Sequence, residues 1–305
     1  MHLRKSPFLL AAVATAVAAL TLTAAPSMAD TQNVSPPGAN DFSCKPSAVH
    51  PLPVILVPGT FEAMSKNWAV MSPVLKNAGY CVFALDYGAE YGVPASGPIE
   101  NSAAQLGDFV NAVLGATGAK QVDLVGHSQG GMMPRYYIKF LGGTKTVHSL
   151  VGIAPSNHGT TSQPNPLSYV PGVSTGGDGA PSTVAAPGYP SAPASPAPGD
   201  VGAAASEQVA GSAFLTKLNA GGDIQGKVLY TTIATTHDEV VTPYTSEALA
   251  GPADQVTNVV IQNFCALDPI EHDQTPNDPV VQQLVLGALS NANGPLSPSF
   301  RPNCL

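Results

Sequence analysis

A serine lies at the centre of a glycine-rich turn, residues 126–131, with the sequence Gly-His-Ser-Gln-Gly-Gly. Residues 121–125 before the turn, which include Val122, Leu124 and Val125, predict a strand, and residues 132–141 after it predict a helix. This G-x-S-x-G pattern between a strand and a helix is typical of a nucleophile elbow, a strained turn whose neighbours must be small. The start of the helix would stabilise negative charge beside Ser128. We therefore expect Ser128 to be a nucleophile, the alternative being a glycine-rich turn without chemistry.

A serine hydroxyl needs a base to remove its proton and a carboxylate to orient that base. In proteins with this elbow the chain order is Ser, then Asp or Glu, then His. His272 follows the last predicted strand and is the histidine that this order selects. The alternative is that it is a solvated loop residue. Five other histidines of the mature chain come too early: His50, His127, His148, His158 and His237.

The acid of such a set must follow a strand between Ser128 and His272. Asp238 meets this requirement, because it lies in the loop after the predicted strand 227–234, and Glu239 beside it is the competitor. Two further acids, Asp223 and Asp254, come before strands, and Asp268 shares the loop of the histidine.

Two backbone N–H groups would stabilise the oxyanion of a tetrahedral intermediate. One belongs to the residue after the nucleophile, Gln129, and the other to a loop after an early strand. Thr60 is our choice for the second, because it follows residues 54–57, and its hydroxyl would add another hydrogen bond. The alternative is that Pro58 and Gly59 merely form a turn.

Strand-like and helix-like segments alternate along the chain. The strand-like runs are short, apolar and rich in β-branched residues: 54–57, 80–85, 122–125, 150–154, 227–234 and 256–261. The helix-like stretches lie between or after them: 68–77, 102–114, 132–141, 206–218 and 278–290. This alternation predicts a single α/β domain over residues 30–305, with a mostly parallel sheet of about six strands and helices on both faces. Active sites of such sheets lie beyond the carboxyl ends of the strands.

Residues 163–205 interrupt this pattern. They are dominated by Pro, Gly, Ser and Ala and have neither helical nor strand periodicity. A long irregular segment inside a domain is typically functional or disordered. We interpret it as an insertion in the catalytic domain, either a lid over an apolar pocket or a passive solvated loop.

The first 29 residues have the pattern of a secretory signal peptide. Arg4 and Lys5 precede an apolar run over residues 8–22, and small residues then lead to Ala29, after which we expect cleavage. The alternative is an uncleaved N-terminal anchor, although the run is short for a membrane span. The pattern predicts a secreted, extracellular protein.

Four cysteines remain in the mature chain, and their spacing does not suggest a zinc site. An even number of cysteines in an exported protein favours disulfides. Three connectivities are possible, and we expect the pairing of sequence neighbours, Cys44–Cys81 and Cys265–Cys304. Loops of that size would contribute about 3–4 kcal/mol each.

Composition narrows the function classes. The chain of 305 residues is 44% hydrophobic and 10% charged, with a formal net charge of −8, which becomes near −10 when Arg4 and Lys5 are removed. So few charges argue against a highly charged disordered tail protein. The acidic balance argues against a nucleic-acid-binding surface.

Three of these segments resemble secreted α/β-hydrolase lipases. Residues 54–60 resemble the oxyanion segment of the fungal lipase B family, Ser128-Gln129-Gly130 its nucleophile turn, and residues 238–243 its acid loop. The bacterial class 2 lipases share this outline, including residues 227–233 before the acid. Similarity covers about residues 53–154 and 227–289. The resemblance implies an α/β-hydrolase fold, two disulfides placed as in the fungal enzymes, and a serine carboxylic-ester hydrolase without metal or cofactor.

The expected activity is hydrolysis of acyl esters, in particular triacylglycerols, through an acyl-enzyme on Ser128. We expect a monomer whose partner is a hydrophobic ester substrate, with transient contact to a lipid interface. Alternatives are a polyester depolymerase or cutinase-like esterase, a secreted acyltransferase with the same triad, and a non-enzymatic binding protein. Glu271 and Asp273 flank the proposed base, and we expect these acids to favour its protonated form.

Overall fold

The computed structural model describes residues 33–90, 92–161, 174–175, 181–182 and 202–304. The predicted signal peptide, residues 1–29, and most of the predicted insertion therefore lie outside the described residues.

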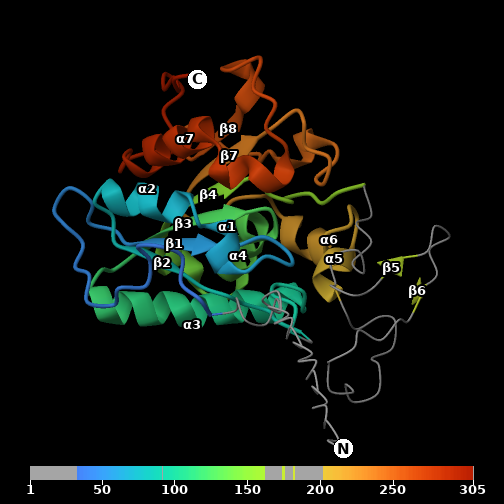
Figure 1. Ribbon diagram of the computed structural model, residues 1–305, viewed down its shortest axis with the longest axis horizontal. Coiled ribbons are helices and arrows are strands. Elements are labelled where there is room, and N and C mark those ends of the chain that lie inside the picture. The colour runs from blue at the N-terminus through green and yellow to red at the C-terminus, as the bar shows by residue number, and fades with distance from the viewer. Residues whose placement is uncertain (1–32, 91, 162–173, 176–180, 183–201, 305) are drawn as a thin grey trace, which may run out of the picture.

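Six parallel strands form the main sheet, in the order β2-β1-β3-β4-β7-β8 (Figure 1). They are β1 (Val54–Val57), β2 (Val82–Ala84), β3 (Val122–His127), β4 (Val147–Ile153), β7 (Leu229–Ala234) and β8 (Val256–Val260). The predicted parallel sheet of about six strands is confirmed. Because neighbouring strands run in the same direction, all their carboxyl ends lie at one edge of the sheet.

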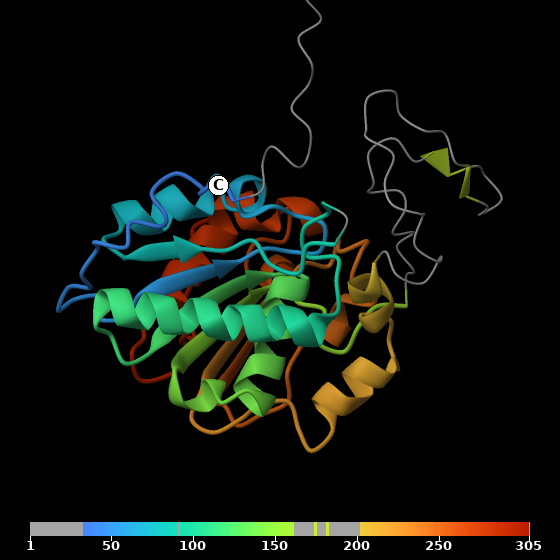
Figure 2. The same cartoon turned by 90° about the horizontal axis from the view of Figure 1, so that it is seen from below.

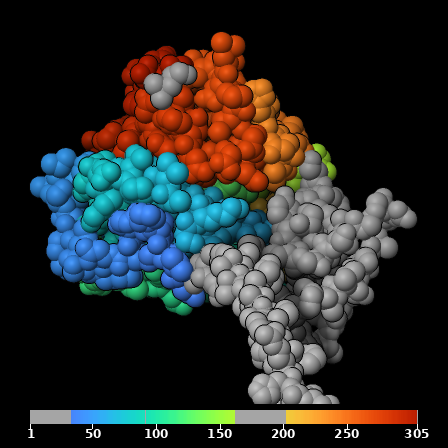
Figure 3. All heavy atoms as spheres, viewed as in Figure 1, coloured from blue at the N-terminus to red at the C-terminus, as the bar shows by residue number. Residues whose placement is uncertain are grey.

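Helices cover both faces of this sheet (Figures 1 and 2). One face packs on α3 (Ile99–Thr117), α4 (Gln129–Phe140) and α6 (Ala213–Asn219), and the other on α1 (Met64–Asn67), α2 (Met71–Asn77) and α7 (Pro279–Leu289). Within β1, Ile55 and Val57 belong to the first core and Val54 and Leu56 to the second. This alternation explains the continuous apolar runs, since each strand is buried on both sides. In Figure 3 the C-terminal segments lie directly on segments from the first third of the chain.

The helix expected at 206–218 is instead two helices, α5 (Ala203–Glu207) and α6. Gly211 between them has a φ of 81°, and the Ser212 hydroxyl caps α6 by accepting from the Leu215 N–H. The first helix ends at Glu207 with Gln208 as its C-cap, and after the left-handed glycine the serine cap begins the second helix. Residue 205, the last residue of the predicted insertion, lies within α5. Inside it, β5 (Ser174–Thr175) pairs antiparallel with β6 (Pro181–Ser182).

Short 3₁₀ helices complete the described elements: η2 (Gly143–Lys145), η4 (Tyr244–Glu247), η5 (Ile261–Asn263) and η6 (His272–Asn277). Among the described residues no helix has both the length and the apolar character needed to span a membrane.

Two disulfides tie the ends of the described chain to its body. Cys44 is bonded to Cys81 just before β2, and Cys304 is bonded to Cys265 just after η5. Disulfides persist in oxidising compartments, so both bonds are compatible with a secreted protein.

Replacing Cys265 and Cys304 together by alanine should lower the free energy of unfolding by about 3–4 kcal/mol, because the bond restricts the unfolded chain. Urea unfolding of the purified protein measures this loss. The matched Cys44→Ala/Cys81→Ala variant should lose a similar amount, since the sequence separations are 39 and 37. A loss below about 1 kcal/mol in either variant would show that its bond adds little to the native state.

Candidate active site

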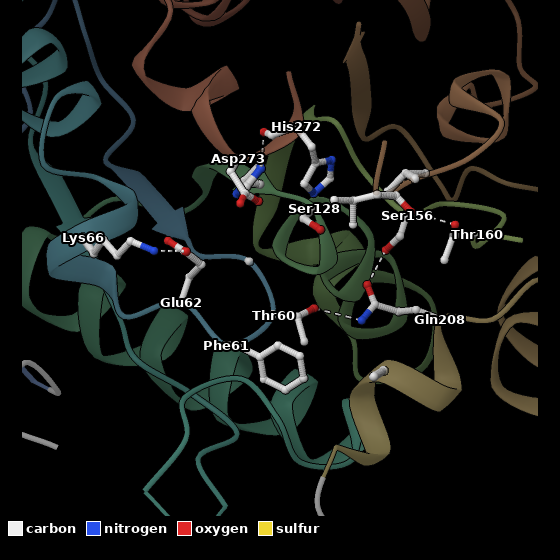
Figure 4. A pocket seen from close by; sticks show the side chains of 15 residues that line it. Thr60, Phe61, Glu62, Lys66, Ser128, Ser156, Thr160, Gln208, His272 and Asp273 are labelled. Atoms are coloured by element: carbon white, nitrogen blue, oxygen red, sulfur yellow. Dashed lines mark hydrogen bonds and ion pairs between the residues drawn. The ribbon is translucent and has the colours of Figure 1, made fainter. Parts of the chain in front are cut away.

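Four residues selected from the sequence follow four different strands at the carboxyl edge of the sheet. Thr60 follows β1, Ser128 follows β3, Asp238 follows β7, and His272 follows β8. Thr60, Ser128 and His272 line one cavity of about 260 Å³ (Figure 4). The parallel sheet thus brings together residues that are distant in sequence.

Ser128 has the backbone geometry of a strained turn, with a φ of 54° and a ψ of −121° directly before α4. A Cβ at Gly126 would overlap the carbonyl oxygen of Gly130, and a Cβ at Gly130 would overlap that of Val57. Both glycines are therefore required for β3, α4 and the end of β1 to approach so closely. Their spacing around the serine is a steric consequence of this turn.

His272 and Asp238 form a buried pair. His272 Nδ1 lies 2.6 Å from Asp238 Oδ2, and both side chains are almost completely enclosed. The other oxygen, Asp238 Oδ1, accepts the backbone N–H groups of Val240 and Val241 at 2.9 and 2.6 Å. These bonds fix the carboxylate, which fixes the ring in turn. In Figure 4 the free end of the His272 ring points towards Ser128.

The rejected acids have other partners. Glu239 accepts the backbone N–H of His272 at 3.5 Å and does not contact the ring nitrogens by hydrogen bonding. Asp223 forms an ion pair with Arg135 at 3.3 Å. Asp268 accepts a backbone N–H of its own loop at 3.0 Å. Of the acids weighed from the sequence, Asp238 is the one seated against the imidazole.

The two residues proposed for the oxyanion hole lie beside each other. Their backbone N–H groups form no hydrogen bond within the described part of the chain. The Thr60 hydroxyl donates to Gln129 Oε1 at 2.8 Å and accepts from Gln208 Nε2 at 2.9 Å. It must therefore turn away from Gln129 to reach an oxyanion.

Gln208 and Ser156 also belong to this hydrogen-bond network, and neither was predicted from the sequence. Gln208 Oε1 accepts from the Ser156 hydroxyl at 2.7 Å, while its amide nitrogen bonds Thr60 (Figure 4). Ser156 comes shortly after β4, so the strand-end rule that selected Asp238 could have found it. No sequence signal distinguishes Gln208, because its burial depends on how α5 packs.

His127 links three of the loops. Its Nδ1 lies 3.1 Å from the Asn67 side-chain nitrogen and its Nε2 lies 3.1 Å from the His272 carbonyl oxygen. Asn67 in turn accepts the N–H of Gly59 at 2.9 Å. Burial, and next the nearby His272, lower the pKa of His127 well below its usual value. A neutral ring satisfies both contacts, by accepting at Nδ1 and donating from Nε2.

The cavity has an apolar wall and a charged rim. Four lining residues are apolar: Phe61, Ala205, Val240 and Val241. Lys66 and Glu62, an ion pair at 2.6 Å, and Asp273 supply the charged groups. Small-molecule sites usually combine apolar walls with a few polar groups, and this volume suits part of an ester.

Glu271, one of the two acids that flank His272 in the sequence, makes hydrogen bonds within and beside its own loop. Glu271 accepts the backbone N–H of Asp273 at 3.1 Å. Burial, followed by a hydrogen bond with Glu239, raises the pKa of Glu271. The raised pKa means that Glu271 takes up its proton at a higher pH than an ordinary glutamate does.

Known proteins share the fold of this chain, and a family model matches its sequence. The chain is similar to the structure of Aspergillus fumigatus lipase B, with a TM-score of 0.65 and 20% identity over 87% of this chain, and it spans 57% of that longer chain. It is also similar to a structure described for the metagenome-derived lipolytic enzymes LipS and LipT, with a TM-score of 0.51, 14% identity, and coverage of 84% of this chain and 99% of that one. These similarities confirm the α/β-hydrolase fold. A family model for class 2 lipases matches residues 51–285. The chain therefore belongs to the class 2 lipase family.

Proposed function

We propose that this lipase-family protein is a secreted serine hydrolase that cleaves acyl esters, with Ser128 as nucleophile, His272 as base and Asp238 as the orienting acid. The observation that carries the proposal is the buried 2.6 Å contact between Asp238 and His272, with the ring directed at a serine in a strained turn (Figure 4). A base held in this way is what a serine hydroxyl needs to become a nucleophile.

In the acylation step, the ester bond to the alcohol is replaced by an ester bond to Ser128, and one proton passes from the serine to the alcohol. Ser128 Oγ forms a bond with the ester carbonyl carbon while its proton passes to His272 Nε2, and the carbonyl oxygen becomes an oxyanion. When the intermediate collapses, the carbon–oxygen bond to the alcohol breaks and the alcohol takes the proton from Nε2. Asp238 stabilises the imidazolium between these steps through Nδ1.

Deacylation repeats the sequence with water. Water gives a proton to His272 Nε2 as its oxygen bonds the acyl carbon, and the second intermediate releases the carboxylic acid. Ser128 then recovers its proton. In both halves the backbone N–H groups of Thr60 and Gln129 stabilise the oxyanion.

The cavity walls support a hydrophobic acyl substrate. Phe61, Ala205, Val240 and Val241 offer apolar surface to an acyl chain. We assign triacylglycerols as the substrate class, in keeping with the lipase family, with transient contact to a lipid interface. Export through the N-terminal signal and action as a monomer belong to the same proposal, and the two disulfides support the extracellular setting.

Ser128→Ala should lower kcat/KM for p-nitrophenyl esters by about 10³-fold or more, because the nucleophile is lost. Esters of graded acyl length and a triacylglycerol emulsion measure the activity, and an added alcohol reveals acyl transfer. Ser290→Ala is the matched control, since it removes the same hydroxyl from an exposed residue at the end of α7. Full activity in Ser128→Ala would end the serine-hydrolase assignment.

Thr60→Val should lower kcat by about 10²-fold with a smaller change in KM, because it removes a hydroxyl that bonds the oxyanion in the transition state. Thr60→Ser keeps the hydroxyl and should stay near wild type. Steady-state kinetics on one soluble ester compare the three proteins. If the valine and serine variants turn over equally fast, the hydroxyl is not an oxyanion donor and the backbone N–H groups act alone.

A further inference from the structure

Glu247 is an acid buried without a donor. It ends η4, and its side chain is completely enclosed. Neither carboxylate oxygen receives a hydrogen bond from a described residue, and the residue belongs to none of the ion pairs found in the described part of the chain. An ionised carboxylate in such a place loses its hydration without compensation, so the environment favours the neutral acid.

The neighbour of this acid is Asp238. Burial, followed by the charge of Asp238 and a hydrogen bond with its side chain, raises the pKa of Glu247 well above its usual value. Two ionised carboxylates contain acceptors alone, so a bond between them requires a proton. Asp238 already accepts the N–H groups of Val240 and Val241 and faces His272 Nδ1. The proton therefore belongs on Glu247.

We infer that Glu247 is a neutral carboxylic acid that donates a hydrogen bond to Asp238 and thereby tunes the protonation of the His272 ring. Glu247 is a positioning residue that touches neither the ester nor the serine. The inference that it affects catalysis rests on the proposed function.

The direction of the effect follows from charge. A hydrogen bond from Glu247 spreads the negative charge of Asp238 and weakens its attraction for an imidazolium. His272 then loses its proton at a lower pH than it would without the donor. Because the resting base must be neutral, the donor extends activity towards acid pH.

Other charged groups near η4 have partners of their own. Asn157 donates to the Glu247 carbonyl oxygen at 2.6 Å, and Arg135 bonds the Asn157 carbonyl oxygen at 3.1 Å. His158 Nδ1 lies 2.9 Å from the Ser246 carbonyl oxygen, and its Nε2 lies 3.1 Å from Asp223. These contacts hold the backbone of η4. Asp238 is the charged side chain against the Glu247 carboxyl.

Around the His272 ring, the ionisable groups besides Asp238 are the same whatever stands at position 247. His127 contacts the His272 carbonyl oxygen, and Glu239 faces the His272 backbone N–H. Glu271 and Asp273 are its sequence neighbours. Replacing Glu247 therefore tests one contact against a constant background.

The kinetic test compares Glu247→Gln with Glu247→Leu. Glutamine keeps a neutral donor of the same shape, and the acidic limb of the kcat/KM profile should stay within about 0.3 pH unit of wild type. Leucine removes the donor, and the limb should move upward by about 1 pH unit. No shift in either variant would overturn the proposal, because a purely structural residue leaves the pH profile in place. Equal shifts in both variants would also overturn it, because glutamine keeps the donor and leucine does not.

Infrared spectroscopy supplies a readout that does not depend on activity or on the leucine variant. In D₂O at neutral pH, the difference spectrum between wild type and Glu247→Gln should contain the carbonyl stretch of a protonated carboxylic acid. Its absence would mean an ionised Glu247 and contradict the inference. Performing the measurement in the Ser128→Ala background separates the two claims: the band reports on Glu247 alone, whereas residual esterase activity there refutes the serine mechanism alone.

Discussion

Parallel pairing of the strands in the main sheet is the constraint on which the candidate site depends. Because β1, β3, β7 and β8 run in the same direction, the loops carrying Thr60, Ser128, Asp238 and His272 all emerge at one edge. The two cores below and above the sheet hold these strands in register. The close-packed cores fix the positions of the strands, and the strands in turn position the side chains of the loops that follow them.

Burial determines the electrostatics of the cluster at that edge. Low local polarity strengthens the contact between Asp238 and His272, and it also makes any unpaired charge there expensive. The neighbours respond by staying neutral: the pKa of His127 is lowered and that of Glu247 is raised, in both cases first by burial. The Asp238 carboxyl therefore faces the imidazole between two buried groups whose environments both favour the uncharged form.

Much of this arrangement could be predicted from the sequence, because local patterns such as apolar runs and strand ends indicate it. Apolar runs located all six strands of the main sheet, and the bounds predicted for β1 match the structure to the residue. The strand-end rule selected Asp238 over Glu239, and the structure seats Asp238 against the ring. The helix predicted over residues 206–218 was wrong, because Ser212 caps a new helix and splits the stretch that was expected to be continuous. A cap inside an apolar period is easily mistaken for a solvent-facing position.

The roles of Gln208 and Glu247 could not be predicted in this way. Both side chains are buried by tertiary packing, and no local sequence pattern indicates that burial. A glutamate in a polar loop is normally solvated, so its sequence context predicts an exposed charge. The fold instead buries the Glu247 side chain completely, and no described residue donates a hydrogen bond to its carboxyl. Since the cost of that burial is avoided by holding a proton, the chemistry of residue 247 is set by tertiary structure. Ser128 differs in this respect: the steric demands of its turn require Gly126 and Gly130 on either side, and these glycines are visible in the sequence.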